Sequence, residues 1–409
     1  MKRVIFSLSF SLFALLMYGQ ITLEECQRKT RENYPLVRQY GLIEKTKEYN
    51  LANASKGYLP QFTLSGKASW QSEVTELPVQ VPGVDIKGLP KDQYQVMLEL
   101  KQNIWDGGEI RSRKEQVKAS SDVDREKLNV DMYALTERVN QVYFGILLLD
   151  EQLRQNQLFL EDLERTHKQI SSYIENGIAS QSDLDAVSVE QLNTRQKRIE
   201  LTSSRQAYLS MLALLTGEEM PAGISLQKPV PEWDIPVIAN NRPELIWFDA
   251  QNGRLQVQEE ALKTQLMPRF GLFVQGAYGN PGLNMLKNEF SPYYVAGVRL
   301  SWNFGSLYTL RNDRRVIAAN RQLLDSNRDV FLFNTRLQAT QQGSAVESVR
   351  RQMADDDEII RLRTSIRKAS EAKVANGTMT SENLARQTKA LHEVQLLMNM
   401  YQLKYTTNN

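Results

Sequence analysis

The sequence predicts a mainly α protein with membrane β-strands, in which long antiparallel coiled-coil helices are joined to four strands. Three observations support this fold class. The chain is duplicated, it contains four segments of strand length with alternating polarity, and residues 108–176 contain no proline and follow a heptad pattern. The duplication is plainest in two turns, YIENGIASQSDL (173–184) and KVANGTMTSENL (373–384).

Composition excludes several classes of function. The 409 residues carry 50 basic and 48 acidic side chains, so net charge does not favour a nucleic-acid partner. The single cysteine, Cys26, excludes a disulfide within the chain and any multi-cysteine metal site. Lys2 and Arg3 precede an apolar run from Val4 to Met17, which predicts a signal peptide over residues 1–19. No later run is long and apolar enough to predict a membrane-spanning helix.

The duplication also predicts the organisation of the chain. Pro35 corresponds to Pro243 and Pro60 to Pro268, and a proline-rich segment separates the two halves. Each half reads as a helix, two strands and two long helices. We expect a first repeat over 20–216, a linker over 217–240 and a second repeat over 241–409, with strands at about 61–70, 94–104, 269–278 and 293–304.

The strand segments alternate with period two. In PQFTLSGKASW the even positions are apolar or small, and the odd positions are polar. About ten residues suffice to cross a bilayer when a strand is tilted, and aromatic residues at both ends of the apolar face are typical of a membrane barrel. A half-buried soluble sheet would alternate in the same way. Polar-face positions such as Thr63 and Glu99 should accept arginine, whereas these residues are predicted to face lipid: Phe62, Leu64, Trp70, Tyr94, Leu98, Phe270, Leu272, Tyr278, Tyr294 and Trp302.

The long helices carry a heptad seam. From Leu128 to Ile174, the apolar residues step by four and three, which predicts a left-handed coiled coil. In the second repeat the same register is diluted by Gln342 and Asp356. That face is expected to be wetter, as the lining of a channel is.

The two repeated turns fit helical hairpins. Gly177 follows the last seam position, where a residue free to adopt positive φ is needed. Ser180 and Asp183 have the spacing of a capping box that starts the returning helix. Thr380 and Asn383 occupy the same places in the second repeat, so each repeat is predicted to form one hairpin.

Together the signal peptide, the duplicated halves and the Asn-Gly tips resemble the TolC-like outer-membrane efflux family. NIWDGGEIRSR (103–113) resembles the strand-to-helix junction of that family, and NGIASQSDL and NGTMTSENL resemble its periplasmic hairpin tips. The likeness covers nearly the whole chain after the signal peptide, in both halves. It implies a homotrimer in the outer membrane, in which three chains contribute four strands each to one twelve-stranded β-barrel, continued by a helical barrel in the periplasm.

The resemblance also implies function and partners. The protein would be a channel-tunnel that exports substrates received from a periplasmic adaptor and an inner-membrane pump of RND or ABC type. The adaptor would contact the tips Asn176, Gly177, Ile178, Ala179, Ser180, Asn376, Gly377, Thr378, Met379 and Thr380. The pore aperture would be formed by Asp183, Asp185, Glu382, Asn383 and Arg386, although Asn383 and Arg386 stand where the family often has acidic residues.

Catalytic chemistry is not indicated. The two histidines, His167 and His392, do not correspond between the repeats and have no partner recognisable in the sequence. We therefore expect no enzyme activity, no metal site and no cofactor. A soluble periplasmic coiled-coil scaffold with a small β-domain is the alternative that the sequence leaves open.

Overall fold

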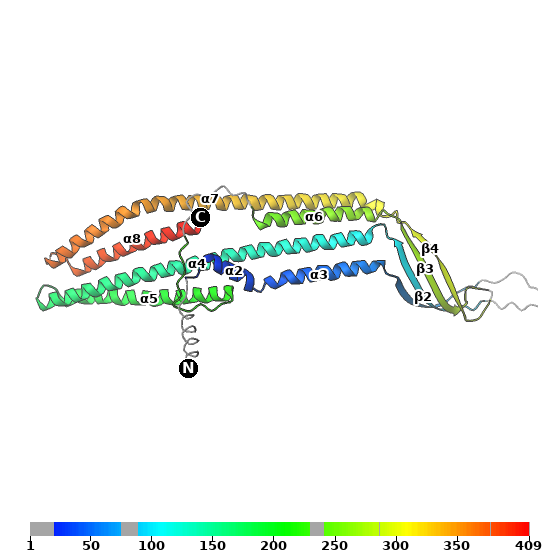
Figure 1. Cartoon of the computed structure of the whole chain (residues 1–409), viewed down its shortest axis with the longest axis horizontal. Coiled ribbons are helices and arrows are strands. Elements are labelled where there is room, and N and C mark those ends of the chain that lie inside the picture. The colour runs from blue at the N-terminus through cyan, green and yellow to red at the C-terminus, as the bar shows by residue number, and fades with distance from the viewer. Residues whose placement is uncertain (1–19, 75–88, 230–240, 286, 377, 409) are drawn as a thin grey trace, which may run out of the picture. The chain divides into compact units, whose positions relative to one another are not determined.

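The computed structural model describes residues 20–74, 89–229, 241–285, 287–376 and 378–408 of the chain. Long helices and four strands make up these residues, which confirms the predicted fold class (Figure 1). The predicted signal peptide, residues 1–19, lies outside the described residues. In chain order the elements are α2 (Leu23–Asn33), α3 (Val37–Ser55), the 3-10 helix η1 (Lys56–Tyr58), β1 (Gln61–Trp70), β2 (Asp92–Trp105), α4 (Glu109–Glu175), α5 (Gln181–Thr216), α6 (Pro243–Thr264), β3 (Arg269–Asn280), β4 (Ser291–Ser301), α7 (Ser306–Ala375) and α8 (Ser381–Asn408).

The chain divides into two compact units, and each takes segments from both sequence repeats. The sheet unit comprises residues 39–128 and 242–329. The helical unit comprises residues 1–38, 129–241 and 330–409. The long helices α4 and α7 each contribute one end to each unit.

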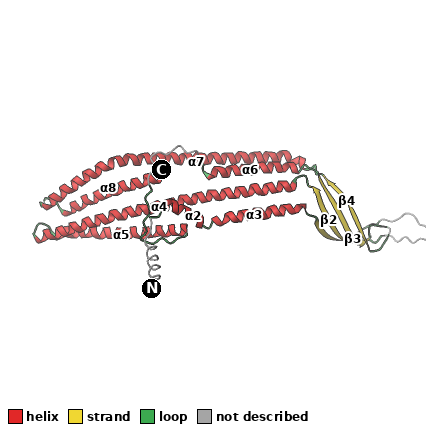
Figure 2. Cartoon of the chain, viewed as in Figure 1, coloured by secondary structure: helices red, strands yellow, loops and turns green. Residues whose placement is uncertain are grey.

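The sheet unit contains one four-stranded antiparallel sheet in the order β1-β2-β3-β4 (Figure 2). Leu98 of β2 lies opposite both Leu64 of β1 and Gly276 of β3, which in turn lies opposite Tyr294 of β4. Because side chains alternate between the faces of a strand, this register gathers the even-numbered residues of all four strands on one face. A register shift between Asn103 and Trp105 adds Trp105 of β2 to this face, opposite Phe270 of β3. The order leaves β1 and β4 as edge strands.

The junction between β2 and α4 depends on two residues, Asp106 and Gly107. The carboxylate of Asp106 is buried and accepts hydrogen bonds from the backbone N–H groups of Gly108 (3.0 Å) and Ile110 (2.7 Å). It thereby satisfies donors that a helix start leaves free. Gly107 has a φ of 69°, and a Cβ there would come within 2.7 Å of the Met267 side chain. Both the conformation and the close approach therefore require glycine.

The fourth strand ends earlier than the sequence pattern suggests. β4 stops at Ser301 rather than near residue 304, so Trp302 lies one residue beyond the strand. The Trp302 indole N–H donates to the carbonyl of Leu266 (3.0 Å), and the Asn303 side chain accepts from the N–H of Gly305 (2.9 Å). These local bonds turn the backbone into α7, and the alternation of side chains alone does not reveal them.

The core of the helical unit lies on the predicted heptad seam. Val139 and Ile146 of α4 are fully buried, and they pack with Leu209 and Leu212 of α5 and with Cys26 of α2. Burial raises the pKa of the Cys26 thiol to about 12, with a smaller contribution from Glu25, so this cysteine is an inert core residue. The seam prediction is confirmed for these positions of the first repeat.

Polar contacts hold the start of the described chain against this core. The fully buried Tyr143 places its hydroxyl 2.8 Å from the carbonyl oxygen of Ile21 and 2.6 Å from that of Gln227. Ile21 also forms a parallel bridge with Leu226. The described part of the predicted linker therefore packs onto the helices beside the beginning of α2.

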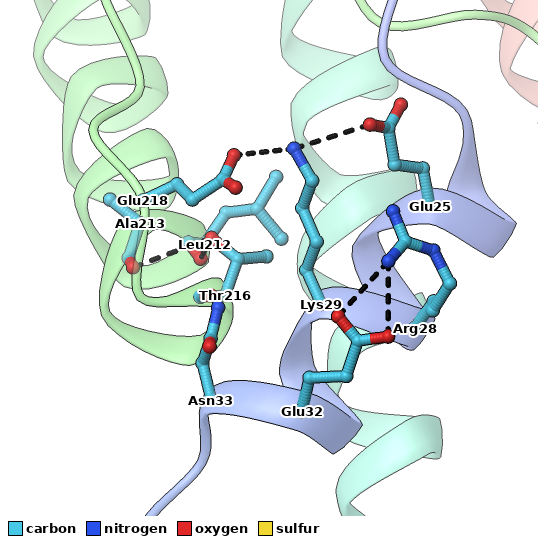
Figure 3. A network of polar contacts seen from close by, with 9 residues as sticks. All are labelled: Glu25, Arg28, Lys29, Glu32, Asn33, Leu212, Ala213, Thr216 and Glu218. Atoms are coloured by element: carbon cyan, nitrogen blue, oxygen red, sulfur yellow. Dashed lines mark hydrogen bonds and ion pairs between the residues drawn. The ribbon is translucent and has the colours of Figure 1, made fainter.

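A second set of contacts ties α2 to the end of α5 (Figure 3). The ammonium of Lys29 lies between the carboxylates of Glu218 and Glu25, the latter at 3.2 Å. The Asn33 side-chain amide donates to the carbonyl of Thr216 (2.7 Å). This carbonyl lies at a helix C-terminus, where no intrahelical donor remains, so Asn33 satisfies it.

Candidate functional site

The even-numbered face of the sheet is apolar and uncovered within the chain. All ten residues predicted to face lipid are exposed, from 40% for Phe270 to 78% for Tyr294. Large apolar side chains that are exposed together mark a surface that contacts another phase or another molecule. Apart from Asp92 at the start of β2, no charged side chain occurs on this face of the four described strands.

Aromatic rings gather at both ends of this apolar face. At the ends of the strands next to the 281–290 loop, the ring of Phe290 lies 6.5 Å from that of Tyr94 and 5.7 Å from that of Tyr278. At the helix side, Trp105 pairs with Phe270 (6.0 Å). Two aromatic groups that flank an apolar band are typical of the interfacial girdles of membrane strands.

The first hairpin tip closes α4 and starts α5. Gly177 has a φ of 70°, and the N–H of Ile178 donates to the carbonyl of Tyr173 (2.8 Å), which is the bond of a Schellman motif. The side-chain amide of Asn176 donates to the carbonyl of Ser172 (2.8 Å). Asn176 and Gly177 therefore each serve the end of α4. The asparagine amide satisfies a carbonyl of the last turn, and the glycine permits the positive φ.

The predicted capping box follows directly and is present. The backbone N–H of Asp183 donates to the Ser180 hydroxyl (3.3 Å), and the Asp183 carboxylate accepts from the Ser180 backbone N–H (3.0 Å) and hydroxyl (2.6 Å). These bonds hold the pKa of the Asp183 carboxyl below its ordinary value.

The second hairpin tip ends α7 as the first tip ends α4, but it starts α8 differently. The N–H of Thr378 donates to the carbonyl of Lys373 (2.9 Å), and the Asn376 amide donates to the carbonyl of Ala372 (2.9 Å). At the start of α8, however, the Asn383 side chain donates to the Thr380 hydroxyl (3.1 Å). The second tip thus has no carboxylate at the position of Asp183. The predicted tip residue Gly377 lies outside the described residues.

Exposure separates the residues predicted to meet a partner. Ile178 is 53% exposed and Thr378 is exposed. Ala179 and Met379, predicted to be presented with them, are only half-buried, and Ala179 packs against the apolar cluster of the first hairpin. A partner would therefore meet the first residue after each glycine position rather than the second.

The residues predicted for the aperture are distributed over the starts of α5 and α8. Asp185 accepts a hydrogen bond from Gln181 (3.0 Å), and both Asn383 and Arg386 are exposed. The side chain of Glu382 lies outside the described residues. How these residues meet around a pore remains a prediction.

A polar cluster that sequence reasoning missed joins the two hairpins. Asp162 of α4 is buried, and its carboxylate pairs with Arg367 of α7 (3.1 Å), with Arg165, and with the Nε2 atom of His392 on α8 (2.8 Å). Nearby, Lys389 of α8 pairs with Glu190 of α5 (2.7 Å). Asp162 is separated from Arg367 by 205 positions of sequence and from His392 by 230, so no local signal could have indicated them.

The charge state of His392 follows from this environment. Burial lowers the pKa of His392 to about 4, with smaller contributions in the same direction from the guanidinium groups of Arg367 and Arg165. The imidazole is therefore neutral near pH 7. Because the facing Asp162 oxygen is an acceptor, the ring proton resides on Nε2 and the histidine donates to the carboxylate. His392 is thus a structural donor that links α8 to α4.

Two further properties of the described residues concern membrane helices and metals. None of the helices in the described part of the chain is both long and apolar enough to span a membrane. No group of three or more histidine, cysteine, aspartate or glutamate side chains in the same residues is arranged to hold a metal ion.

Comparison with known proteins supports the resemblance. The family model described as "outer membrane efflux protein" matches residues 28–218. No curated protein sequence matches the chain. Among solved structures, the chain is similar to CusC, with 13% identity, a TM-score of 0.69 and coverage of 94% of this chain and 90% of CusC. It is similar to the Campylobacter jejuni CmeC outer membrane channel (14% identity, TM-score 0.66, coverage 94% and 83%) and to VceC of Vibrio cholerae (12% identity, TM-score 0.62, coverage 94% of each).

These comparisons confirm the likeness to the TolC-like outer-membrane efflux family. This likeness supports the expected location of the chain in the outer membrane, with its helices in a periplasmic tunnel. Of these proteins, CusC and CmeC are described as channels and VceC as an outer membrane protein. The likeness favours a channel over the alternative, a soluble periplasmic scaffold.

Proposed function

Because the chain has the fold of outer-membrane efflux channels, we propose that it exports solutes as a homotrimer, receiving them from a periplasmic adaptor and an inner-membrane pump. One observation carries this proposal: the sheet exposes a continuous apolar face and has two open edges, β1 and β4. An open edge leaves backbone N–H and C=O groups unpaired, which lipid does not tolerate.

Closure by identical copies resolves this problem. With β1 antiparallel to β2 and so on through β4, the β4 edge of one copy can pair antiparallel with the β1 edge of the next. Three copies would then give twelve strands, with the apolar face toward lipid and the polar face toward the interior. The pump is of RND or ABC type in this proposal, since both types work with channels that such adaptors engage.

Trimer formation has a direct test. Outer-membrane fractions are expected to retain the chain after carbonate extraction, and unheated samples should migrate on gels as a trimer that heating converts to the monomer. Full extraction by carbonate, or migration as a monomer before heating, would contradict the proposal.

The partners are tested at the hairpin tips. A photoreactive residue at position 178 or 378 should crosslink to the periplasmic adaptor in cells that contain the pump. The same probe at position 64, on the apolar face of β1, is the matched control and should give no adaptor crosslink. Crosslinks from 178 and 378 only to outer-membrane or extracellular partners would place the tips at the wrong end.

The aperture is tested by separating charge from capping. We propose that the Asp183 carboxylate helps to close the pore, so that Asp183→Asn raises ion leakage. Ser180→Ala weakens the same helix cap but keeps the carboxylate, and it should leave leakage unchanged. Equal leakage in the two variants would show that the cap, and not the charge, controls closure.

A further inference from the structure

The polar face of the sheet carries an unbalanced set of charges. Its residues are the odd-numbered positions of the four strands, and they include Lys67, Lys101 and Arg299 but only one acidic residue, Glu99. A fourth cation, Arg269, pairs with Glu109 at the start of α4 (2.9 Å) and is thereby neutralised. Among the described residues of this face, two positive charges per chain therefore remain in excess.

The single carboxylate is already engaged. The Glu99 side chain is only 13% exposed, and its oxygens lie 2.8 Å from the Lys101 ammonium, 2.9 Å from the Gln275 amide nitrogen and 3.7 Å from the Arg299 guanidinium. One acid that is shared between two cations cannot neutralise both. Lys101 and Arg299 remain about half exposed (47% and 51%), so their charge is available to solutes on this side of the sheet.

The arrangement is held in place. The Arg299 guanidinium lies 4.9 Å from the centre of the Phe273 ring, in cation–π geometry, while its other contact is Glu99. Lys101 and Phe273 lie opposite each other in the register of β2 and β3, so the cluster spans three neighbouring strands. Lys67 lies closer to the loop end of β1 and is exposed. The cations therefore recur along the sheet rather than at one point.

We propose that these residues make the barrel interior prefer anions over cations. The proposal rests on the trimeric barrel proposed above, because that closure turns the polar face of each copy toward one lumen. Rings of lysine and arginine side chains are the usual means by which pores select anions. Three copies would repeat the excess charge of Lys67, Lys101 and Arg299 around the passage, so the channel favours solutes that carry negative groups.

The test measures the reversal potential of the purified full-length trimer in a planar bilayer under a potassium chloride gradient at low salt. The reversal potential of the wild type is expected to lie between zero and the equilibrium potential of chloride. The preference should weaken as salt is raised, because the Debye length falls from about 30 Å at 0.01 M to about 3 Å at 1 M. Lys67→Gln/Lys101→Gln should lower the chloride-to-potassium permeability ratio several-fold, and Glu99→Gln should raise it.

Thr63→Gln is the matched control, since it enlarges a side chain on the same face without changing charge. Its permeability ratio should equal that of the wild type. Variants are compared only as heat-modifiable trimers, so a folding defect is recognised before recording. Absence of any channel conductance, also in the Asp183→Asn variant that is proposed to open the pore, would overturn the proposed channel itself. Normal conductance with a cation preference, or a ratio that the lysine and glutamate variants leave unchanged, would overturn the anion selectivity alone.

Discussion

The two sequence repeats build the same hairpin from differently balanced helices. In the first repeat, Ile146 on the seam of α4 is fully buried in an apolar core. At the corresponding place in α7, 200 positions later, Val346 is only half-buried. Further along α7, the carboxylate of the buried Asp356 has one oxygen without a hydrogen-bond partner among the described residues, and burial raises its pKa. Duplication has thus preserved the turns and the register, while the apolar core is concentrated in one copy.

The two hairpins are therefore stabilised by different kinds of contact. An apolar seam stabilises a hairpin within one chain, whereas a seam containing Gln342 and Asp356 contributes little apolar burial of its own. The second hairpin is instead tied to the first by the ion pairs and hydrogen bonds around Asp162.

The largest effect is expected from aspartate in the two seams. Ile146→Asp would bury an unpaired carboxylate and should cost about 3–5 kcal/mol of unfolding free energy, as uncompensated buried charges do. Val346→Asp is the matched variant in the second repeat and should cost about 1 kcal/mol, since that site is partly open to water. Trimer yield and thermal unfolding measure both. Equal losses would break the comparison.

In the sheet, substitutions in the two repeats should have equal effects, because the corresponding strand positions have the same environment. Leu64 of β1 and Leu272 of β3 correspond at an offset of 208, and both are exposed on the apolar face. Arginine at either position should cost about 2–4 kcal/mol near the bilayer midplane and reduce assembled trimer to the same degree. Thr63→Arg on the polar face is the control and should assemble normally. Equal defects on both faces would contradict a membrane-facing orientation.

One expectation from the sequence needs correction at this sheet. The alternation alone predicts that Glu99 accepts arginine like Thr63, because both are polar-face positions. In the structure Glu99 is nearly covered and contacts two cations. Arginine at this position would place three positive groups together, so we expect Glu99→Arg to impair assembly.

Sequence patterns predict what depends on near neighbours. The alternation around Leu64, the seam through Ile146 and the cap between Ser180 and Asp183 each involve residues that are close in the chain, and the structure contains all three. They follow from the periods of strands and helices and from the needs of helix ends. The face on which each strand residue lies can therefore be assigned from the strand's own residues.

The contacts that the sequence did not predict join segments that are far apart in the chain. Tyr143 lies 122 positions from Ile21, and Asp162 lies 230 positions from His392. Neither pair has a spacing that a local rule would select, and His392 has no counterpart in the first repeat. Trp302 shows the same limit on a smaller scale, because its bond to Leu266 ends a strand that the alternation would have continued.

A smaller effect is expected at the first tip. A Cβ at Gly177 would meet no atom within 4 Å, so substitution there changes only the backbone preference at a φ of 70°. Gly177→Val should cost about 1 kcal/mol or more and weaken adaptor binding while trimers still form. Gly177→Asn is the control, since asparagine tolerates this conformation better than other side chains. Hydrogen exchange over 173–184 and adaptor pull-down measure the two consequences. Equal effects of valine and asparagine would exclude backbone strain as the cause.

The smallest effect should appear where the two tips differ in charge. The capping bonds lower the pKa of Asp183 from its ordinary value of 3.8. A depressed carboxyl pKa contributes stability above the unfolded-state pKa, and that contribution is lost as the pH falls below 3.8 through the folded-state value. Protection of the first turn of α5 against hydrogen exchange, corrected for the intrinsic rate, should therefore decrease in acid, whereas the first turn of α8 should not respond through Asn383.

Asn383→Asp should complete a capping box with Thr380 and add about 0.5 kcal/mol of local stability near pH 7. The same substitution should transfer the acid sensitivity to the start of α8, and an unchanged pH response there would show that the Thr380 turn cannot accommodate the reciprocal bonds that Ser180 makes in the first repeat.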